Sequence, residues 1–278
     1  MPLLHAIILG IIQGLTEFLP VSSSAHLALI PWLLGWNDQG LSFDIALHVG
    51  TVAAVIVYFF RDWVQVIAQG FGLRFGSDPA LRRNPKLLWF LVLGSVPAGI
   101  AGLLVKDLAE NVWRNNQYLI GTMLIAVGLF MWWADRQGSR RKDLGGVSAL
   151  DSLTIGVAQA LALVPGVSRS GITICAGLLR DLDRASAARF SFLLATPAIA
   201  GAAAKDAWDL MRHGNGIPPD LRTALIVGVV ASAITGALTI QFFLNYLRHR
   251  SLSFFVWYRV IFGIIVIALA TFFRYHGG

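Results

Sequence analysis

Six stretches of the 278-residue chain consist almost entirely of apolar residues. About 20 apolar residues in one helix cross the hydrocarbon core of a bilayer, and each stretch is close to that length. They comprise residues 43–60, 87–105, 118–134, 186–204, 223–244 and 254–273. The pattern predicts an all-α polytopic membrane protein with six transmembrane helices.

Two further apolar stretches, residues 3–35 and 150–183, are interrupted in the middle by a proline followed by small polar residues. The first interruption begins at Pro20 and the second at Pro165. Proline breaks the hydrogen bonding of a helix, and irregular backbone is tolerated at membrane depth only beside protein or water. We therefore predict two re-entrant helical hairpins, with the second helix of the second hairpin over residues 172–180.

The two interrupted stretches resemble one another. Gln13 aligns with Gln159 at an offset of 146 residues, Pro20 aligns with Pro165 at nearly the same offset, and a serine cluster follows each proline. The match predicts that the two hairpins are equivalent parts of an internal repeat.

The repeat extends over one membrane domain, residues 1–278, with the first copy at about 1–134 and the second at about 150–273. Each copy contains one hairpin and three predicted spans. Because three is an odd number, the second copy is predicted to be inverted in the membrane. Inverted repeats with broken helices place their binding site near the bilayer midplane.

Charged residues make up only 13% of the chain, against roughly 25% in soluble domains. The net charge of +7 is concentrated in the loops 61–86, 135–143 and 248–250, whereas loops 106–117 and 205–222 are nearly neutral. Basic loops face the cytoplasm in membrane proteins. This distribution orients the protein, with both termini outside, and it argues against a nucleic-acid partner.

Glu17 lies in a segment almost free of charge and is one helical turn from Gln13. A carboxylate inside a membrane is a functional candidate. It is expected to bind a hard divalent cation or to act as a general base. The alternative is a carboxyl group near the interface, or a protonated one that hydrogen-bonds a neighbour.

Three serines, 22 to 24, follow Pro20, and His26 lies three residues after Ser23. Ser23 and His26 therefore have the spacing of a nucleophile and its base on one helix face. The alternative for one of the serines is to cap the second half of the hairpin.

Arg169 cannot lose its charge, so it needs an anionic partner. Ser168, Ser170 and Thr173 surround it just before a predicted helix, which resembles a cradle for a phosphate group. The alternative is a structural ion pair with Glu17, which is compatible with anion binding. The motif alone does not separate phosphate from carboxylate.

Two weaker signals remain. Asp44 and His48 share a helix face and are possible ligands, but they suit the membrane surface equally well, so they stay outside the predicted site. The small residues at 201–204 permit close approach of a second helix and so a homodimer.

The sequence resembles the undecaprenyl-diphosphate phosphatases of the bacitracin-resistance type. Three blocks carry the resemblance: residues 13–23 with His26, the Pro-Gly-Val-Ser-Arg-Ser-Gly-Ile-Thr run at 165–173, and residues 190–195 with Pro197. It extends over nearly the whole chain.

The resemblance implies a bacterial plasma-membrane enzyme that hydrolyses undecaprenyl diphosphate to undecaprenyl phosphate and inorganic phosphate. This reaction recycles the lipid carrier of cell-wall synthesis and is linked to bacitracin resistance. The resemblance also implies dependence on Mg²⁺ or Ca²⁺. The implied catalytic and diphosphate-binding residues are Gln13, Glu17, Ser23, His26, Ser168, Arg169, Ser170 and Thr173.

Gln13 occupies a position where the family has Glu or Gln, so this motif offers one carboxylate, Glu17, to a metal ion. In the mechanism we expect, Arg169 holds the diphosphate, Ser23 or a water attacks the terminal phosphorus, and His26 moves a proton. A transporter or flippase of prenyl phosphate lipids is the rival interpretation, since carriers are also built from inverted repeats with broken helices.

Overall fold

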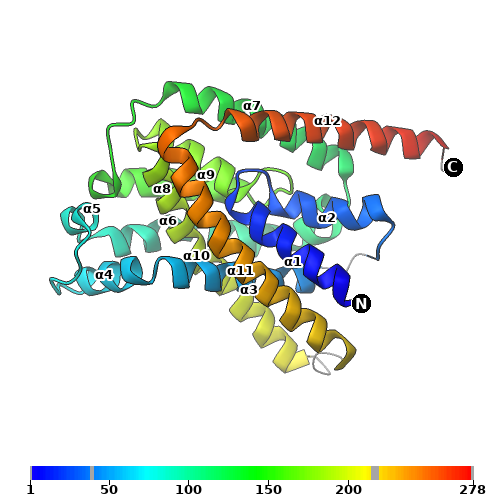
Figure 1. Cartoon of the computed structure of the whole chain (residues 1–278), viewed down its shortest axis with the longest axis horizontal. Helices are drawn as coiled ribbons and strands as arrows, with labels where there is room; N and C mark the ends of the chain where they lie inside the picture. The colour runs from blue at the N-terminus through cyan, green and yellow to red at the C-terminus, as the bar shows by residue number, and fades with distance from the viewer. Residues whose placement is uncertain (1, 38–40, 214–218, 277–278) are drawn as a thin grey trace.

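The computed structural model describes residues 2–37, 41–213 and 219–276, which are almost entirely helical and contain no β-strand (Figure 1). The elements in chain order are α1 Leu3–Phe18, α2 Ser23–Leu34, α3 Leu41–Tyr58, α4 Phe60–Gly70, α5 Pro79–Arg83, α6 Leu87–Leu108, the π-helix η1 Ala109–Trp113, α7 Gln117–Gln137, the 3₁₀-helix η2 Leu144–Gly146, α8 Ala149–Leu161, α9 Arg169–Leu179, α10 Arg184–His213, α11 Pro219–His249 and α12 Ser253–His276. The predicted all-α class is confirmed.

Four helices of the described chain are long and apolar enough to cross a bilayer: α6, α7, α11 and α12. The pair α3 and α4 makes a fifth if it counts as one bent span. The chain is therefore a multi-pass membrane protein with four or five candidate spans among the described residues. The expected span at 186–204 is helical within α10, but it is not one of these candidates.

The expected straight span at 43–60 differs in the structure, because α3 ends at Tyr58 and the chain bends by 75° into α4. Charge explains the bend. Asp62, at the start of α4, pairs with Arg189 of α10 at 2.6 Å, and a charged residue is costly at membrane depth. Bending the chain keeps this ion pair away from the apolar span.

Both interrupted stretches are helix pairs, α1 with α2 and α8 with α9, as the prolines predict. The residues before α2 and α9, Ser22 and Ser168, have φ angles of 77° and 71°, a region that non-glycine residues rarely occupy. Each serine hydroxyl accepts a hydrogen bond from the backbone N–H three residues later. The two breaks thus share one local geometry.

The second half of the second pair begins earlier than we expected. α9 starts at Arg169 rather than at 172, because Ser168 caps it by accepting from the Gly171 N–H at 3.2 Å. Arg169 consequently lies in the first turn of a helix, where backbone N–H groups have no partner within the helix.

Aromatic side chains from distant parts of the chain meet beneath the two breaks. The ring of Phe192 in α10 lies 5.2 Å from that of Phe18 in α1 and 6.2 Å from that of Phe243 in α11, centroid to centroid. All three are buried. Because Phe18 follows Glu17 directly, this cluster fixes the end of α1 where the predicted site begins.

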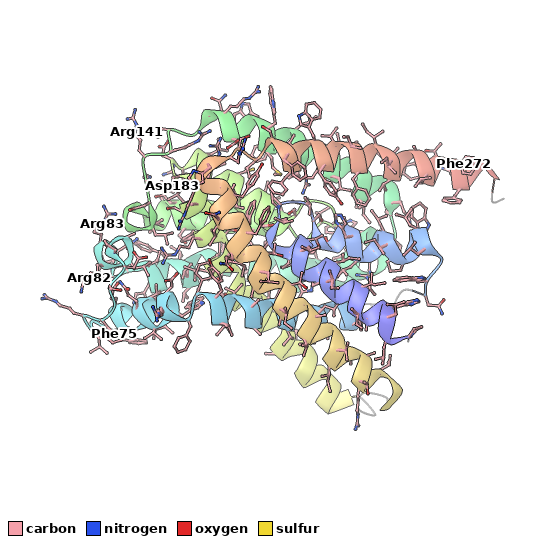
Figure 2. The ribbon with its side chains drawn as sticks, viewed as in Figure 1. Phe75, Arg82, Arg83, Arg141, Asp183 and Phe272 are labelled. Carbon is pink, nitrogen blue, oxygen red and sulfur yellow. The ribbon has the colours of Figure 1, made fainter. Side chains whose placement is uncertain are left out.

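The basic residues Arg82, Arg83 and Arg141 lie at one end of the molecule, and Phe272 lies at the other (Figure 2). Both chain termini are at the end marked by Phe272 (Figure 1). The basic loops and the termini therefore lie at opposite ends. The small-residue run predicted for dimerisation includes Ala202 and Ala203, whose side chains are outside the described part of the structure.

Glycine permits several close helix crossings, and one lies on each of the two broken helix pairs. A Cβ on Gly10 of α1 would lie 2.5 Å from the carbonyl oxygen of Gly228 in α11, and a Cβ on Gly156 of α8 would lie 2.2 Å from that of Gly94 in α6. Neither distance is sterically possible. The backbones of each helix pair are therefore in direct contact, as is common between membrane helices.

Gly156→Ala should destabilise the protein by ~1–3 kcal/mol, because the added methyl group pushes α8 and α6 apart. Gly99→Ala is the matched control: it lies on α6 with nothing within 4 Å of the new Cβ, and alanine favours a helix by ~0.5–1 kcal/mol over glycine. Thermal unfolding of the detergent-purified variants should move in opposite directions. Equal shifts would show that the crossing is not tight.

Candidate active site

The site lies where the two broken helix pairs meet. The Ser170 hydroxyl, on the first turn of α9, donates to the carbonyl oxygen of Leu19 at 3.1 Å. The breaks predicted from separate parts of the sequence are therefore adjacent in space.

Glu17 is the centre of the site and is only 5% exposed. Its Oε2 accepts hydrogen bonds from the Gln13 amide at 3.0 Å and from the Ser23 hydroxyl at 2.5 Å. Its Oε1 accepts from Nη2 of Arg169, which forms an ion pair with it. The ion pair that the sequence left as an alternative is present, and it joins the two breaks directly.

His48 belongs to this cluster, although the sequence gave no reason to prefer it over a surface position. Its Nδ1 donates to the carbonyl oxygen of Asp44 at 2.7 Å, and its Nε2 lies 3.3 Å from Oε2 of Glu17. Since Nδ1 already carries a proton, a favourable contact between Nε2 and the carboxylate needs a second one. The contact therefore requires a proton between Nε2 of His48 and Oε2 of Glu17.

Asp44, considered together with His48, has a different role. Its carboxylate pairs with Arg114 at 2.6 Å. The i to i+4 spacing of Asp44 and His48 identified a real contact, but only the imidazole reaches the site.

His26 does not contact Ser23, contrary to the spacing argument. Its Nδ1 lies 2.8 Å from the carbonyl oxygen of Ser22, to which it must donate, and its Nε2 lies 2.7 Å from the hydroxyl of Tyr258. Its ring is stacked on Phe262 at 4.8 Å. The sequence offered no signal for Tyr258, because it lies 232 residues away on α12.

The hydroxyl groups of the second break hold the local backbone. Ser168 caps α9, Ser170 binds the carbonyl oxygen of Leu19, and Thr173 donates to the carbonyl oxygen of Arg169 at 2.7 Å and lies 2.6 Å from the Ser191 hydroxyl. In this structure these three side chains position Arg169. Their predicted contact with a phosphate stays a prediction.

Two buried polar atoms in the site have no hydrogen-bond partner: Oε1 of Gln13 and Nη1 of Arg169. Leaving a polar atom buried and unpaired costs ~1–3 kcal/mol. One is an acceptor and the other a cationic donor, so the site is prepared for a ligand that carries both negative oxygens and a cation or proton.

The described residues contain no group of three or more His, Cys, Asp and Glu side chains that suits a metal ion. The oxygen atoms available near Glu17 are its own carboxylate, Oε1 of Gln13 and the Ser23 hydroxyl. Hard cations such as Mg²⁺ and Ca²⁺ prefer such oxygen ligands and complete their shell with water or phosphate oxygens. The residues therefore fit a hard cation in the type of their oxygen ligands, with Arg169 and His48 on the two carboxylate oxygens of Glu17 in this structure.

Arg259 of α12 is fully buried and connects the two breaks from behind. Its guanidinium donates to the carbonyl oxygens of Pro20, Gly166 and Val167 at 3.2, 2.7 and 3.1 Å, and to two carbonyls of α7. No carboxylate of the described chain pairs with it. Its function is to satisfy carbonyl groups that neither broken helix can satisfy itself.

Arg259→Met should lower stability by ~3 kcal/mol or more, because it leaves several buried carbonyls unpaired. The stability of Arg259→Lys should lie between those of the wild type and Arg259→Met, since an ammonium group cannot reproduce the planar guanidinium. The exposed Arg250→Met is the control. Thermal unfolding in detergent measures all three, and an Arg259→Met transition at the temperature of the control would disprove this role.

Comparison with known proteins identifies the family of the chain. The family described as "Bacitracin resistance protein BacA" matches residues 6–265. Undecaprenyl-diphosphatase from Pelotomaculum thermopropionicum is 47% identical over 271 residues, 98% of each chain, and that from Trichlorobacter lovleyi is 48% identical over 269 residues, 97% of each. Matches of this extent cover nearly the whole chain, which belongs to the bacitracin resistance protein BacA family.

Proposed function

We propose that this protein hydrolyses undecaprenyl diphosphate to undecaprenyl phosphate and inorganic phosphate, and so recycles the carrier lipid of cell-wall synthesis. Relatives that are nearly half identical over their full length carry the name undecaprenyl-diphosphatase. The observation that carries the proposal is the Glu17, Ser23 and Arg169 cluster, which combines a base, a hydroxyl and a guanidinium.

Arg169 is proposed to bind the diphosphate. Its Nη1 is buried without a partner, and a guanidinium can bind two phosphate oxygens at once. The first turns of α2 and α9 begin at Ser23 and Arg169, and helix N-termini favour anions. When the substrate arrives, its negative oxygens replace the carboxylate of Glu17 as partners of the guanidinium.

Ser23 is proposed as the nucleophile and Glu17 as its base. The Ser23 hydroxyl already donates to Oε2 of Glu17 at 2.5 Å, so its proton passes to that carboxylate as Oγ attacks the terminal phosphorus. The bond to the bridging oxygen breaks, and undecaprenyl phosphate leaves. A water molecule then releases inorganic phosphate from the serine. His26, held by Ser22 and Tyr258, is assigned to positioning the first break.

A divalent cation, Mg²⁺ or Ca²⁺, is proposed to bind at Glu17, Oε1 of Gln13 and Ser23. When bound, such an ion neutralises charge on the phosphate oxygens. Arg169 and the neighbouring helix N-termini supply further positive potential around the substrate.

For the architecture, we propose six spans and two re-entrant hairpins arranged as inverted repeats. Three equivalences support this. The breaks share the strained serine geometry at Ser22 and Ser168, the first hairpin crosses α11 at Gly10 as the second crosses α6 at Gly156, and Ser23 and Arg169, at the same offset of 146, both contact Glu17.

We further propose a bacterial plasma-membrane location with both termini outside and the basic loops in the cytoplasm. The separation of the basic loops from the chain termini supports this orientation (Figures 1 and 2). The first hairpin would then open to the outside and the second to the cytoplasm.

Arg169→Ala and Glu17→Gln should each lower phosphate release from a prenyl diphosphate by about 10²-fold or more. The exposed Arg141→Ala is the control and should retain activity. Purified protein in detergent, with Mg²⁺ and without a membrane gradient, is the preparation to use. Near-normal release by Arg169→Ala would contradict the site assignment, and no release by the wild-type chain would favour a carrier.

Orientation can be tested with single cysteines, since the native Cys175 is buried. Asn115→Cys, in the connection between η1 and α7, should react with an impermeant maleimide on intact cells. Gln137→Cys, at the end of α7, should react only after permeabilisation. Both positions are exposed. The reverse pattern would invert the proposed topology while leaving the phosphatase proposal unaffected.

A further inference from the structure

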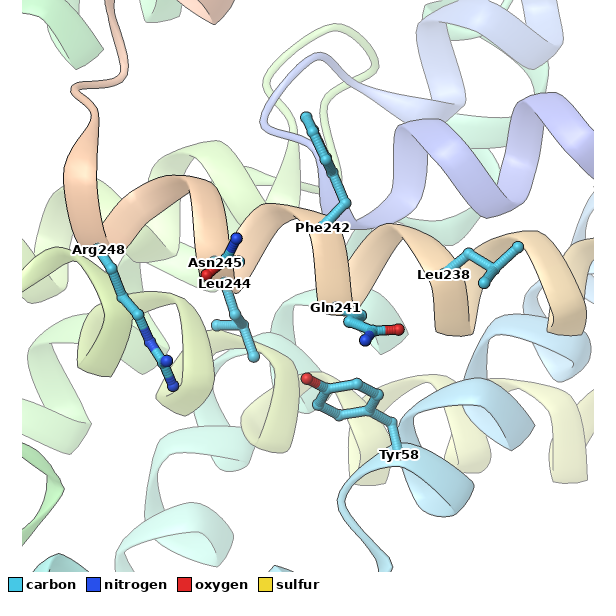
Figure 3. Close-up of a pocket in the computed structure, with 7 residues that line it drawn as sticks. All are labelled: Tyr58, Leu238, Gln241, Phe242, Leu244, Asn245 and Arg248. Atoms are coloured by element: carbon cyan, nitrogen blue, oxygen red, sulfur yellow. The ribbon is translucent and has the colours of Figure 1, made fainter.

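A cavity of 430 Å³ lies on the outer face of α11, beside Tyr58 at the end of α3 (Figure 3). The residues that line it and enter the argument are Tyr58, Leu238, Gln241, Phe242, Asn245 and Arg248. It is separate from the active site, because Phe243, the next residue on α11, is buried against Phe192 on the other side of the helix.

The cavity contains a polar stripe on a helix that otherwise suits a membrane. Gln241, Asn245 and Arg248 are spaced by four and three residues on α11, which places them on one helix face, and all three are exposed. α11 is a candidate span over Leu221–His249. Among the described residues, none of the three side chains has a hydrogen-bond or ion-pair partner.

The position of this stripe along α11 favours an occupant. Arg248 is in the last turn of α11, two residues before the short connection to α12, so it lies near the membrane surface. Gln241 is seven residues earlier, about 10 Å deeper along the helix. The interfacial layer is only ~5–8 Å thick on each side. An amide facing hydrocarbon at that depth needs a polar partner from outside the chain.

The lining indicates the chemistry of that partner. Arg248 is its single charged residue, the two amide groups and the Tyr58 hydroxyl can donate, and no acidic side chain lines the cavity. Phe242, beside Gln241, is apolar and 59% exposed, and toward the membrane interior Leu238 and Ile234 follow at 62% and 59%. A ligand with one negative charge, further acceptor oxygens below it and then a hydrocarbon chain matches this order.

We propose that this cavity binds an anionic glycerophospholipid. Arg248 and Asn245 bind its phosphodiester, Gln241 and Tyr58 donate to its ester carbonyl oxygens, and an acyl chain follows Leu238 and Ile234. This site is additional to the active site and does not depend on the proposed reaction.

The cavity has polar groups at two depths, Arg248 and Asn245 near the end of α11 and Gln241 deeper. This arrangement distinguishes a glycerophospholipid from the enzyme's own lipid. In a prenyl phosphate, the phosphate joins the hydrocarbon chain directly. With its phosphate at Arg248, such a lipid would have no polar group at the depth of Gln241. In a glycerophospholipid, two ester carbonyls lie between phosphate and acyl chains. The proposal therefore makes the ester groups, as well as the charge, part of recognition.

Native mass spectrometry of the full purified chain tests the proposal with four lipids: ester-linked phosphatidylglycerol, its ether-linked analogue, phosphatidylcholine and a prenyl monophosphate. The wild-type chain should retain the ester-linked lipid most strongly. Arg248→Gln should weaken that binding about tenfold, whereas Arg250→Gln, an exposed arginine outside the cavity, should change it less than about twofold. Gln241→Leu should reduce retention of the ester-linked lipid to that of its ether-linked analogue.

Four results would overturn the proposal. Equal losses in Arg248→Gln and Arg250→Gln would indicate attraction by surface charge alone. Equal retention of phosphatidylcholine would remove the role of net charge. Stronger retention of the prenyl monophosphate would assign the cavity to the enzyme's own lipid. A dimer that is lost in Arg248→Gln would assign it to a second copy of the chain. All variants change exposed side chains, and circular dichroism verifies that they fold.

Discussion

The ion pair between Glu17 and Arg169 is the interaction on which the site depends. Each charge alone would be very costly at membrane depth, and each break supplies a counter-charge for the other, with His48 of α3 as a further partner of Glu17. Folding must therefore bring both interrupted helices together before either can remain in the membrane. The glycine crossings at Gly10 and Gly156 allow this approach, because they bring α1 and α8 against the helices that carry them.

Arg259 solves a second problem, the unpaired carbonyl groups of the broken helices. A break in a membrane helix exposes backbone that lipid cannot hydrate. One buried guanidinium pairs with carbonyls of Pro20, Gly166 and Val167 and with α7 behind them. The same side chain thus fixes the distance between the two breaks. Arg259 supplies the charge that pairs with backbone carbonyls, whereas Arg169 supplies the charge that is proposed to bind substrate.

The helical class, both breaks and the central residues Glu17, Ser23 and Arg169 were predictable from the sequence, because proline, serine clusters and isolated charges are local signals. The Glu17–Arg169 pair was foreseen as an alternative. His48 was a possible ligand that stayed outside the predicted site, and Tyr258 was not foreseen, since each reaches its partner through tertiary packing. The spacing of Ser23 and His26 predicted a contact that the structure lacks: the Ser23 hydroxyl donates to Glu17, and His26 contacts Ser22 and Tyr258 instead.

With Arg169 as the proposed binding group for the diphosphate, the ion pair also has a consequence for selectivity. Any anion that takes Nη2 of Arg169 must displace a carboxylate that is already bound there, so Glu17 acts as an internal competitor. Weakly charged anions gain too little to displace it. A diphosphate, with more negative oxygens, gains more than inorganic phosphate or a phosphomonoester does. Once the anhydride is cleaved, the carboxylate can return to the guanidinium, and the same contact that holds the empty site together favours release of both products.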